Sequence, residues 1–272
     1  MCIRDSSHLA CQDGFPSMTP QPCASFAAAF AQVSSRAARL AMIPVENTVA
    51  GRVSDIYHLL PEGGLHIIGE QYLAVHHQLL AVPGAKLSDL KSARSHPMAL
   101  GQVRKRLAAM DIKPISDVDT AGAARNVAEL GDKSIAAIAS SLAAKTYGLD
   151  ILAADIEDAS HNTTRFLILA DKPLDMPRGN DPVVTSFVFK VRSVPSALYK
   201  ALGGFATNGI NMTKLESYMV GGSFQAAQFY ADVEGHPDDE GMKHALEELS
   251  FFSESVTMLG TYPAHPSRSQ KS

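Results

Sequence analysis

Short apolar runs alternate with helix-like patterns between residues 88 and 156. The clearest helix is Thr120–Leu130, where small and apolar residues recur at helical spacing between a capping residue, Asp119 or Thr120, and a terminating Gly131. Apolar runs of strand length, such as residues 134–139 and 149–156, lie between the helical segments. Strands that alternate with helices predict a parallel α/β sheet with short connections.

Two further extended segments precede this region. Residues 40–47 (LAMIPVEN) read as a strand that runs into a polar turn. Residues 65–82 are long, extended and rich in Val, Ile and Leu, and the pattern predicts one strand that crosses between two lobes.

The pattern changes at residues 171–182, where proline, glycine and charged residues indicate a linker. Beyond it, strand and helix patterns follow in the order β-α-β-β-α-β, which is the ferredoxin-like arrangement. We therefore expect one domain over residues 1–175 and a second over residues 183–264. The last nine residues, AHPSRSQKS, have a composition typical of a disordered tail.

Composition excludes several classes of protein. The chain has 272 residues, 46% of them hydrophobic and 19% charged, with a formal net charge of −4, so it is typical of a globular protein without a basic face for nucleic acid. No apolar run approaches the ~20 residues of a membrane span, and because MCIRDSSHLA has no long apolar stretch we expect no secretory signal. Three cysteines without CxxC spacing, Cys2, Cys11 and Cys23, predict free thiols in the cytoplasm rather than a metal site.

Polar residues open one apolar strand, HNTTRFLILA at residues 161–170. In an extended chain Thr164 and Phe166 share one face, whereas Thr163 and Arg165 share the other. Threonine favours strands and arginine marks exposed strand ends, which is one explanation. The other is that hydroxyls and a guanidinium at a strand end bind a carboxylate.

Other strand and helix ends are polar as well. In IPVENTVAGRV, Glu46 and Asn47 follow a strand, and Thr48 is placed to cap a helix. In SHPMALGQ, Ser95 or His96 caps a helix, whose first backbone N–H groups suit an anion. An ordinary cap explains each of these equally well. His76 and His77 read as surface histidines of a strand. Several such ends in one α/β unit favour a small carboxylic acid as ligand, and no phosphate loop, metal cluster or GxSxG motif is present.

Taken in order, IPVENT, SHPMALGQ, DTAGAAR and TRF after an asparagine, followed by a β-α-β-β-α-β unit, closely resemble the prephenate dehydratase family from about Ser7 to Pro266. The resemblance implies a two-lobed catalytic domain like a periplasmic binding protein, and a C-terminal ACT domain that binds phenylalanine as feedback inhibitor. It also implies a carbon–oxygen lyase that converts prephenate to phenylpyruvate, water and CO2 without a cofactor or metal.

The resemblance also assigns residues to roles. The essential threonine falls on Thr164, within the catalytic TRF of Thr164, Arg165 and Phe166, and we expect its hydroxyl to hydrogen-bond the departing oxygen. Substrate-binding residues are expected at Glu46, Asn47, Thr48, Ser95, Asn162 and Thr163. The phenylalanine site is expected at Ala197, Leu198, Asn208, Asn211, Met212, Leu215, Glu216 and Ser217. ACT domains pair side by side, which implies a homodimer or homotetramer.

The sequence departs from the family in two places. The family opens with a strand and a Gly-rich turn, and MCIRDS stands there instead, so we expect that strand to be missing. In the regulatory unit SALYKAL and ESYM replace GALxxxL and ESRP. Three alternatives stay open: an arogenate dehydratase, a solute-binding protein of the same fold, and an inactive protein that senses phenylalanine.

Overall fold

The computed structural model describes residues 5–159, 161–179, 181–192, 194–219 and 226–268. The chain forms two compact units. The first comprises residues 1–24, 44–52 and 72–166, and the second comprises residues 25–43, 53–71 and 167–272. Each unit is therefore assembled from separate stretches of sequence. Among the described residues, every helix is too short or too polar to span a membrane.

The first unit contains a five-stranded sheet of order β6-β5-β7-β4-β8. Its strands are β4 (Gln78–Ala81), β5 (Ser92–Ser95), β6 (Lys113–Ser116), β7 (Ile135–Ala139) and β8 (Asp150–Ala153). Strand β5 is parallel to β6 and β7, whereas β4 is antiparallel to β7 and β8. The parallel arrangement predicted for residues 88–156 is present in both pairs of β5. Strand β4 comes from the preceding run, follows another strand directly instead of a crossover helix, and inserts antiparallel between β7 and β8.

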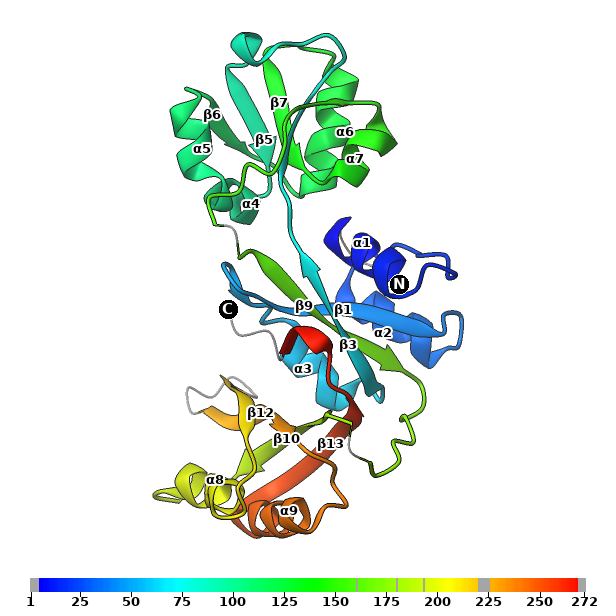
Figure 1. Cartoon of the computed structure of the whole chain (residues 1–272), viewed down its shortest axis with the longest axis vertical. Coiled ribbons are helices and arrows are strands. Elements are labelled where there is room, and N and C mark those ends of the chain that lie inside the picture. Colours follow the sequence, from blue (N-terminus) through cyan, green and yellow to red (C-terminus); the bar gives the residue numbers. More distant parts are fainter. Residues whose placement is uncertain (1–4, 160, 180, 193, 220–225, 269–272) are drawn as a thin grey trace. The chain divides into compact units, whose positions relative to one another are not determined.

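Helices cover both faces of this sheet. Figure 1 shows α5 (Arg104–Ala109) on one side and α6 (Thr120–Leu130) with α7 (Ser141–Tyr147) on the other. The predicted bounds of α6 are confirmed: the Asp119 carboxylate accepts the Gly122 N–H at 2.6 Å, and Gly131 ends the helix at φ 66°. A short 3-10 helix, η1 (Leu87–Asp89), precedes β5. The small buried side chains Ala123, Ala124 and Val127 let α6 lie close to the strands.

Two segments predicted as continuous are interrupted. Leu100, Val103, Leu107 and Met110 stand at helical spacing and predict one helix over residues 98–110. The chain instead forms α4 (Pro97–Gln102) and α5, separated at Val103, where φ is −121° and the helix breaks. The extended run 65–82 forms β3 (His66–Ala74) and β4, which belong to different sheets, with residues 75–77 between them. Hydrophobicity alone does not show that the chain changes sheet inside an apolar run.

A second sheet of order β2-β1-β9-β3 connects stretches far apart in sequence. It contains β1 (Leu40–Asn47), β2 (Gly51–Arg52), β3 and β9 (Thr163–Ala170). Six of the eight residues of β9 are buried, because it lies inside the sheet between β1 and β3. The helices of this part are α1 (Asp5–Gly14), α2 (Phe26–Ser34) and α3 (Ile56–Glu62). The expected loss of a strand ahead of Ser7 concerns a start of which residues 1–4 lie outside the described part.

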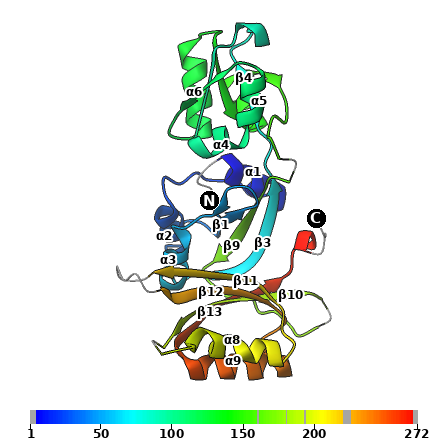
Figure 2. The same cartoon turned by 90° about the vertical axis from the view of Figure 1, so that its left-hand side faces the viewer.

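The C-terminal elements follow the predicted β-α-β-β-α-β order. They are β10 (Val183–Val191), α8 (Ala197–Thr207), β11 (Met212–Met219), β12 (Ala226–Glu234), α9 (Glu240–Phe252) and β13 (Ser253–Pro263). The sheet order is β11-β12-β10-β13, and both helices lie on one face of it (Figure 2). Phe187 and Phe189 of β10 pack in the core with α8 and α9. On the opposite face Tyr230, paired with Val188, contacts the Tyr57 ring of α3 at 5.4 Å between centroids.

The expected disorder of the tail is wrong as far as Arg268, and residues 269–272 lie outside the described part. Residues Pro266–Arg268 form a 3-10 helix, η2. The Arg268 guanidinium donates to Glu70 at 2.9 Å and lies 3.4 Å from Asp232, and both carboxylates are fully buried. Because a buried carboxylate requires a partner, the tail is ordered where it supplies the cation.

One glycine allows two backbones to touch. A side chain at Gly260 of β13 would overlap the backbone of Ile67 in β3. Only glycine permits this approach, so β13 and β3 pack backbone to backbone at this point.

Candidate active site

Backbone and hydroxyl contacts hold the turn after β1 against the start of β9. The Thr48 N–H donates to the Thr163 carbonyl at 2.9 Å, and the Thr163 N–H donates to Thr48 Oγ1 at 2.9 Å. The Thr48 hydroxyl in turn donates to the carbonyl of His161. Thr48 therefore does not cap a helix, since the next one, α3, begins at Ile56. Instead it fixes Asn47 beside the residues that open β9.

The orientation of the Asn47 side chain is fixed by its backbone partners. Its Oδ1 accepts the N–H groups of Val49 at 2.9 Å and Ala50 at 2.8 Å. Because a backbone N–H can only donate, the oxygen of the amide must lie on this side. The Asn47 NH2 group therefore points the other way, where it donates to Asn162 Oδ1 at 2.8 Å and to Thr164 Oγ1 at 2.9 Å.

The same reasoning extends to two more side chains. Asn162 Nδ2 donates to Gln102 Oε1 at 3.0 Å, and His77 Nε2 lies 2.6 Å from that oxygen. An amide oxygen only accepts, so His77 carries a hydrogen on Nε2. Burial lowers the pKa of His77 below its ordinary value, which favours the neutral ring. We call these five hydrogen-bonded side chains the polar chain: His77, Gln102, Asn162, Asn47 and Thr164.

The direction of the polar chain decides what Thr164 can do. Its Oγ1 accepts a hydrogen bond from Asn47 and cannot donate back to an NH2 group. The hydroxyl hydrogen of Thr164 is therefore directed elsewhere. Thr164 is a hydrogen-bond donor held at the start of β9, with a side chain that is largely buried.

The two residues after Thr164 have different surroundings. Arg165 Nη1 donates to Glu46 Oε1 at 3.0 Å, and the arginine side chain is only 4% exposed, against 33% for Glu46. This pairing agrees with the predicted alternation, because Arg165 and Thr164 contact different residues of β1. Phe166 is fully buried in the core. A direct contact between Arg165 and a substrate carboxylate stays a prediction.

The helix start at SHPMALGQ separates the two predicted caps. His96 Nδ1 accepts the Met98 N–H at 3.2 Å, so His96 is the cap of α4. Ser95 is fully buried and its hydroxyl donates to the Ile138 carbonyl at 2.6 Å, which ties β5 to β7. A role for Ser95 as a substrate donor stays a prediction.

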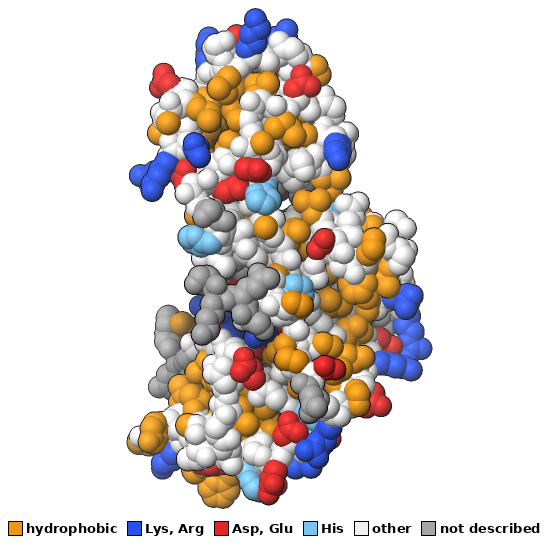
Figure 3. Space-filling model, in the orientation of Figure 1, with side chains coloured by type: hydrophobic (Ala, Val, Ile, Leu, Met, Phe, Trp, Pro, Cys, Tyr) orange, Lys and Arg blue, Asp and Glu red, His pale blue; other side chains and the backbone are white. Residues whose placement is uncertain are grey.

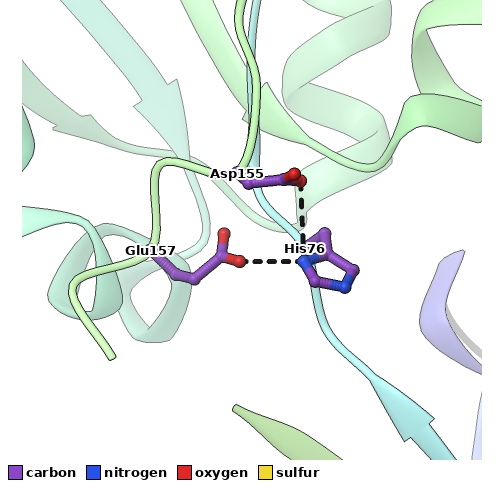
Figure 4. A group of neighbouring side chains, drawn as sticks. All are labelled: His76, Asp155 and Glu157. Carbon is purple, nitrogen blue, oxygen red and sulfur yellow. Dashed lines mark hydrogen bonds and ion pairs between the residues drawn. The ribbon is translucent and has the colours of Figure 1, made fainter. Parts of the chain in front are cut away.

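A group of one histidine and two acidic side chains lies next to the polar chain in sequence. His76 Nδ1 is 2.9 Å from Glu157 Oε1 and 3.5 Å from Asp155 Oδ1 (Figure 4). Their ligand atoms lie within 4.8 Å of one another, so this is a group of described residues able to hold a metal ion. Burial acts to raise the pKa of Glu157, but hydrogen bonds from the His77 backbone N–H and the His76 ring outweigh it and the pKa is lowered. These contacts, together with backbone hydrogen bonds, hold residues 75–77 against residues 154–162.

Two members of the polar chain were missed by the sequence reasoning. The sequence pattern places Gln102 in a helix without indicating a further role, and it predicts that His77 is a surface histidine of a strand. The second interpretation is wrong, because His77 is 6% exposed and bonded to Gln102. The position of Gln102 at the last residue of α4 was the available signal, but its partners are 25 and 60 residues away.

The predicted phenylalanine residues belong to three parts of the C-terminal unit. Ala197 and Leu198 begin α8, which starts from Ser196 in the left-handed conformation at φ 62°. The side chain of Asn208 donates to the Gly204 carbonyl at 2.8 Å, and that of Asn211 donates to Glu234 at 2.9 Å. These four positions lie around the two ends of α8.

The remaining positions lie on β11. Met212 packs against the core under the helices. Alternation along the strand places Leu215 and Ser217 on the face opposite to Glu216, which contacts Lys214 at 3.2 Å. Binding of phenylalanine by residues 215–217 stays a prediction.

Surface charge and thiols agree with the composition. On the face that Figure 3 shows, basic and acidic side chains are scattered among apolar and polar ones. Cys11 and Cys23 form no disulfide, whereas Cys2 lies outside the described residues.

Known proteins are similar to this chain in sequence and in fold. The prephenate dehydratase family model matches residues 6–174. The chain belongs to the prephenate dehydratase family. A bifunctional N-acyl-homoserine lactone acylase/prephenate dehydratase of Komagataeibacter europaeus is 50% identical over 262 residues, which cover 96% of this chain and 93% of that protein. The family is a carbon–oxygen lyase family, so the predicted enzyme class is confirmed.

Two other relatives are similar to this chain, one in its solved structure and one in its sequence. The crystal structure of a prephenate dehydratase of Arthrobacter aurescens in complex with L-Phe superposes with a TM-score of 0.88 at 28% identity, covering 100% of this chain and 90% of that one. Arogenate dehydratase/prephenate dehydratase 1 of Arabidopsis thaliana is 41% identical, over 94% of this chain and 69% of that protein. The predicted fold class is confirmed.

Proposed function

We propose that this protein converts prephenate to phenylpyruvate, with Thr164 as the donor to the leaving hydroxyl. The family match supports the reaction. The observation that carries the role of Thr164 is the direction of the hydrogen bond from Asn47, which makes the threonine oxygen an acceptor there and leaves its hydrogen for a ligand. In this proposal residues 1–175 are the catalytic domain and residues 183–264 the regulatory domain.

The chemistry requires little beyond positioning and one donor. The bond between the ring and the carboxylate breaks, CO2 leaves, and its electron pair enters the ring as the C4 hydroxyl departs. One proton is taken up to release that hydroxyl as water, and the product ring is aromatic. Threonine is too weak an acid to supply the proton alone, so Thr164 hydrogen-bonds the departing oxygen and stabilises its developing negative charge, while solvent provides the proton.

The surrounding polar residues are proposed to bind the rest of the substrate. Hydrogen-bond donors and hydroxyls near the start of β9 suit carboxylate and keto oxygens. Arg165, paired with Glu46, holds β1 and β9 in register beside them. The proposed set is Glu46, Asn47, Thr48, Ser95, Asn162 and Thr163.

Regulation by phenylalanine is proposed for the C-terminal unit. The L-Phe complex of the relative from Arthrobacter aurescens supports this. The proposed assembly is a homodimer or homotetramer paired through these units. The proposed compartment is the cytoplasm, in line with the lack of a disulfide at Cys11 and Cys23.

The test measures phenylpyruvate formed from prephenate and phenylalanine formed from arogenate, each with and without added phenylalanine. We expect turnover of prephenate that phenylalanine suppresses. A preference for arogenate would replace prephenate as the substrate, and no turnover of either by the folded chain would overturn the proposal.

The role of Thr164 is tested by Thr164→Val, which keeps the shape and the strand preference but removes the hydroxyl. We expect kcat to fall about 10²-fold or more, which is the scale for one donor to a transition state. Thr164→Ser is the matched control, because it keeps the hydroxyl. Near-normal turnover by Thr164→Val would remove Thr164 from the mechanism.

A second candidate activity comes from the 50% identical relative, whose name includes N-acyl-homoserine lactone acylase. Release of homoserine lactone from an N-acyl-homoserine lactone measures it directly. If this release persists in Thr164→Val while prephenate turnover is lost, the two activities use different groups. If wild type releases none, the acylase activity is not shared by this chain.

A further inference from the structure

We propose that His77 is a positioning residue for Thr164, acting through Gln102, Asn162 and Asn47. This inference rests on the proposed dehydratase function, because its effect on catalysis is read at Thr164. His77 does not contact Thr164; the three amide side chains between them carry the orientation.

The orientation of each amide in the polar chain is fixed by contacts at both ends. At one end, two backbone N–H groups hold the oxygen of Asn47. At the other end, His77 lies 2.6 Å from Gln102 Oε1 and must present a hydrogen on Nε2. Between the ends, Asn47 donates to Asn162 and Asn162 donates to Gln102, whose oxygen accepts from both Asn162 and His77.

If His77 carried its hydrogen on Nδ1 instead of Nε2, no reorientation of the amides would restore all the hydrogen bonds of the polar chain. With the hydrogen on Nδ1 alone, the Nε2 lone pair would face the Gln102 oxygen. Turning Gln102 over would bring its NH2 group against that of Asn162, and turning Asn162 as well would bring two NH2 groups together at Asn47. Asn47 cannot turn, because its oxygen is held by the backbone N–H groups of Val49 and Ala50. The conflict therefore ends beside Thr164.

Burial and backbone hydrogen bonds hold His77 in place. The residue is 6% exposed. Its backbone N–H donates to Glu157 Oε2 at 2.9 Å, and its backbone carbonyl accepts the Ile156 N–H at 2.9 Å. Burying an imidazole costs more than burying a leucine unless its hydrogen bond is made. The hydrogen bond of the His77 imidazole is the one to Gln102 Oε1.

The consequence for the reaction is a rotational one. The 2.9 Å bond from Asn47 occupies one lone pair of Thr164 Oγ1, and so limits the directions of its O–H. Asn47 keeps its orientation, because Val49 and Ala50 hold its oxygen, but its NH2 group is shared between Asn162 Oδ1 and Thr164 Oγ1. Without the donor on His77, Gln102 and then Asn162 are held less firmly, so the Asn47 NH2 group and with it the Thr164 hydroxyl are less well positioned. We expect kcat to fall about tenfold, the factor that corresponds to about one hydrogen bond, with KM nearly unchanged.

Three substitutions in the full chain test this with matched geometry. His77→Gln places its NH2 group where Nε2 of histidine lies, and we expect kcat within about threefold of wild type. His77→Asn carries the same amide, but its NH2 group corresponds to Nδ1 and does not reach Gln102, so we expect the tenfold loss. His77→Leu should show the same loss. His76→Gln, a change in the neighbouring exposed histidine, is the control for local disturbance.

Two further results separate positioning from a general loss of folding. In the double variant His77→Leu, Gln102→Leu, the loss in kcat should be much smaller than the product of the two single losses, because both residues act through the same polar chain. Equal kcat in His77→Gln and His77→Asn, or multiplicative losses, would overturn the proposal. Thermal unfolding of each variant shows how much of any change comes from stability.

A readout without substrate distinguishes failure of this inference from failure of the proposed function. Nitrogen-15 NMR of the imidazole should show the neutral His77 ring protonated at Nε2. An Nδ1-protonated ring overturns the polar chain, even if prephenate turnover is normal. If wild type converts neither prephenate nor arogenate, the function fails, while the NMR result still decides the orientation of the polar chain.

Discussion

Replacing Arg268 by methionine tests whether the tail is part of the folded core. Its guanidinium contacts Glu70 at 2.9 Å and Asp232 at 3.4 Å, and neither carboxylate is exposed. Removing one partner of a buried ion pair costs about 3–5 kcal/mol of the free energy of unfolding. Asp232 would keep hydrogen bonds from Ser186 and Tyr230, both at 2.6 Å, so we expect the lower end, about 3 kcal/mol.

The chain offers a direct assay and a matched control for Arg268→Met. It has no tryptophan and seven tyrosines, so tyrosine fluorescence follows urea unfolding around Tyr230 and its neighbours. Arg178 is 3.2 Å from Asp239 with both side chains well exposed, and Arg178→Met should cost less than about 1 kcal/mol. A loss of under about 1 kcal/mol in Arg268→Met would refute the reasoning, because a buried pair cannot be that weakly coupled to folding.

Three smaller changes test other features. Ser196→Gly should raise the free energy of unfolding by about 0.5 kcal/mol, measured by urea unfolding, because glycine adopts φ 62° without strain. Thr48→Val should lower the free energy of unfolding by about 1–2 kcal/mol, since it removes the hydroxyl that contacts Thr163 and His161, whereas Thr48→Ser should retain it. The unfolding free energy should also fall as the pH drops below about 6.5, because the folded pKa of His77 is lowered and the unfolded chain takes up the proton first. In His77→Gln this part of the pH dependence should disappear; an unchanged slope would mean that other groups cause it.

Features with local causes could be read from the sequence. Helix α6 was predicted to the residue because Asp119 and Gly131 mark its ends by contacts within a few positions. The alternation of Thr164 and Arg165 on β9 also follows from strand geometry alone. The register that places Asn47 beside Thr164 depends on two strands more than a hundred residues apart, and only the family resemblance connected them in advance.

Features that depend on distant partners could not be read in this way. The polar character of AHPSRSQKS suggested disorder, yet Arg268 is ordered by carboxylates on β3 and β12. His77 stands in an apolar run like any strand histidine, and its partner Gln102 is fixed only when α4 packs beside it. In both cases a buried hydrogen-bonding need decides the structure, and that need is invisible until the fold is known.

The backbone contact between Gly260 and Ile67 limits how this protein can evolve by recombination. An exchange that brings in a foreign C-terminal unit must bring a glycine at this position of β13, since a methyl group already overlaps the backbone of β3. It must also bring an arginine in the tail to meet Glu70. The two halves of the gene are therefore expected to be inherited together, and a chimaera that ignores either position should fail to assemble even when each half is well made.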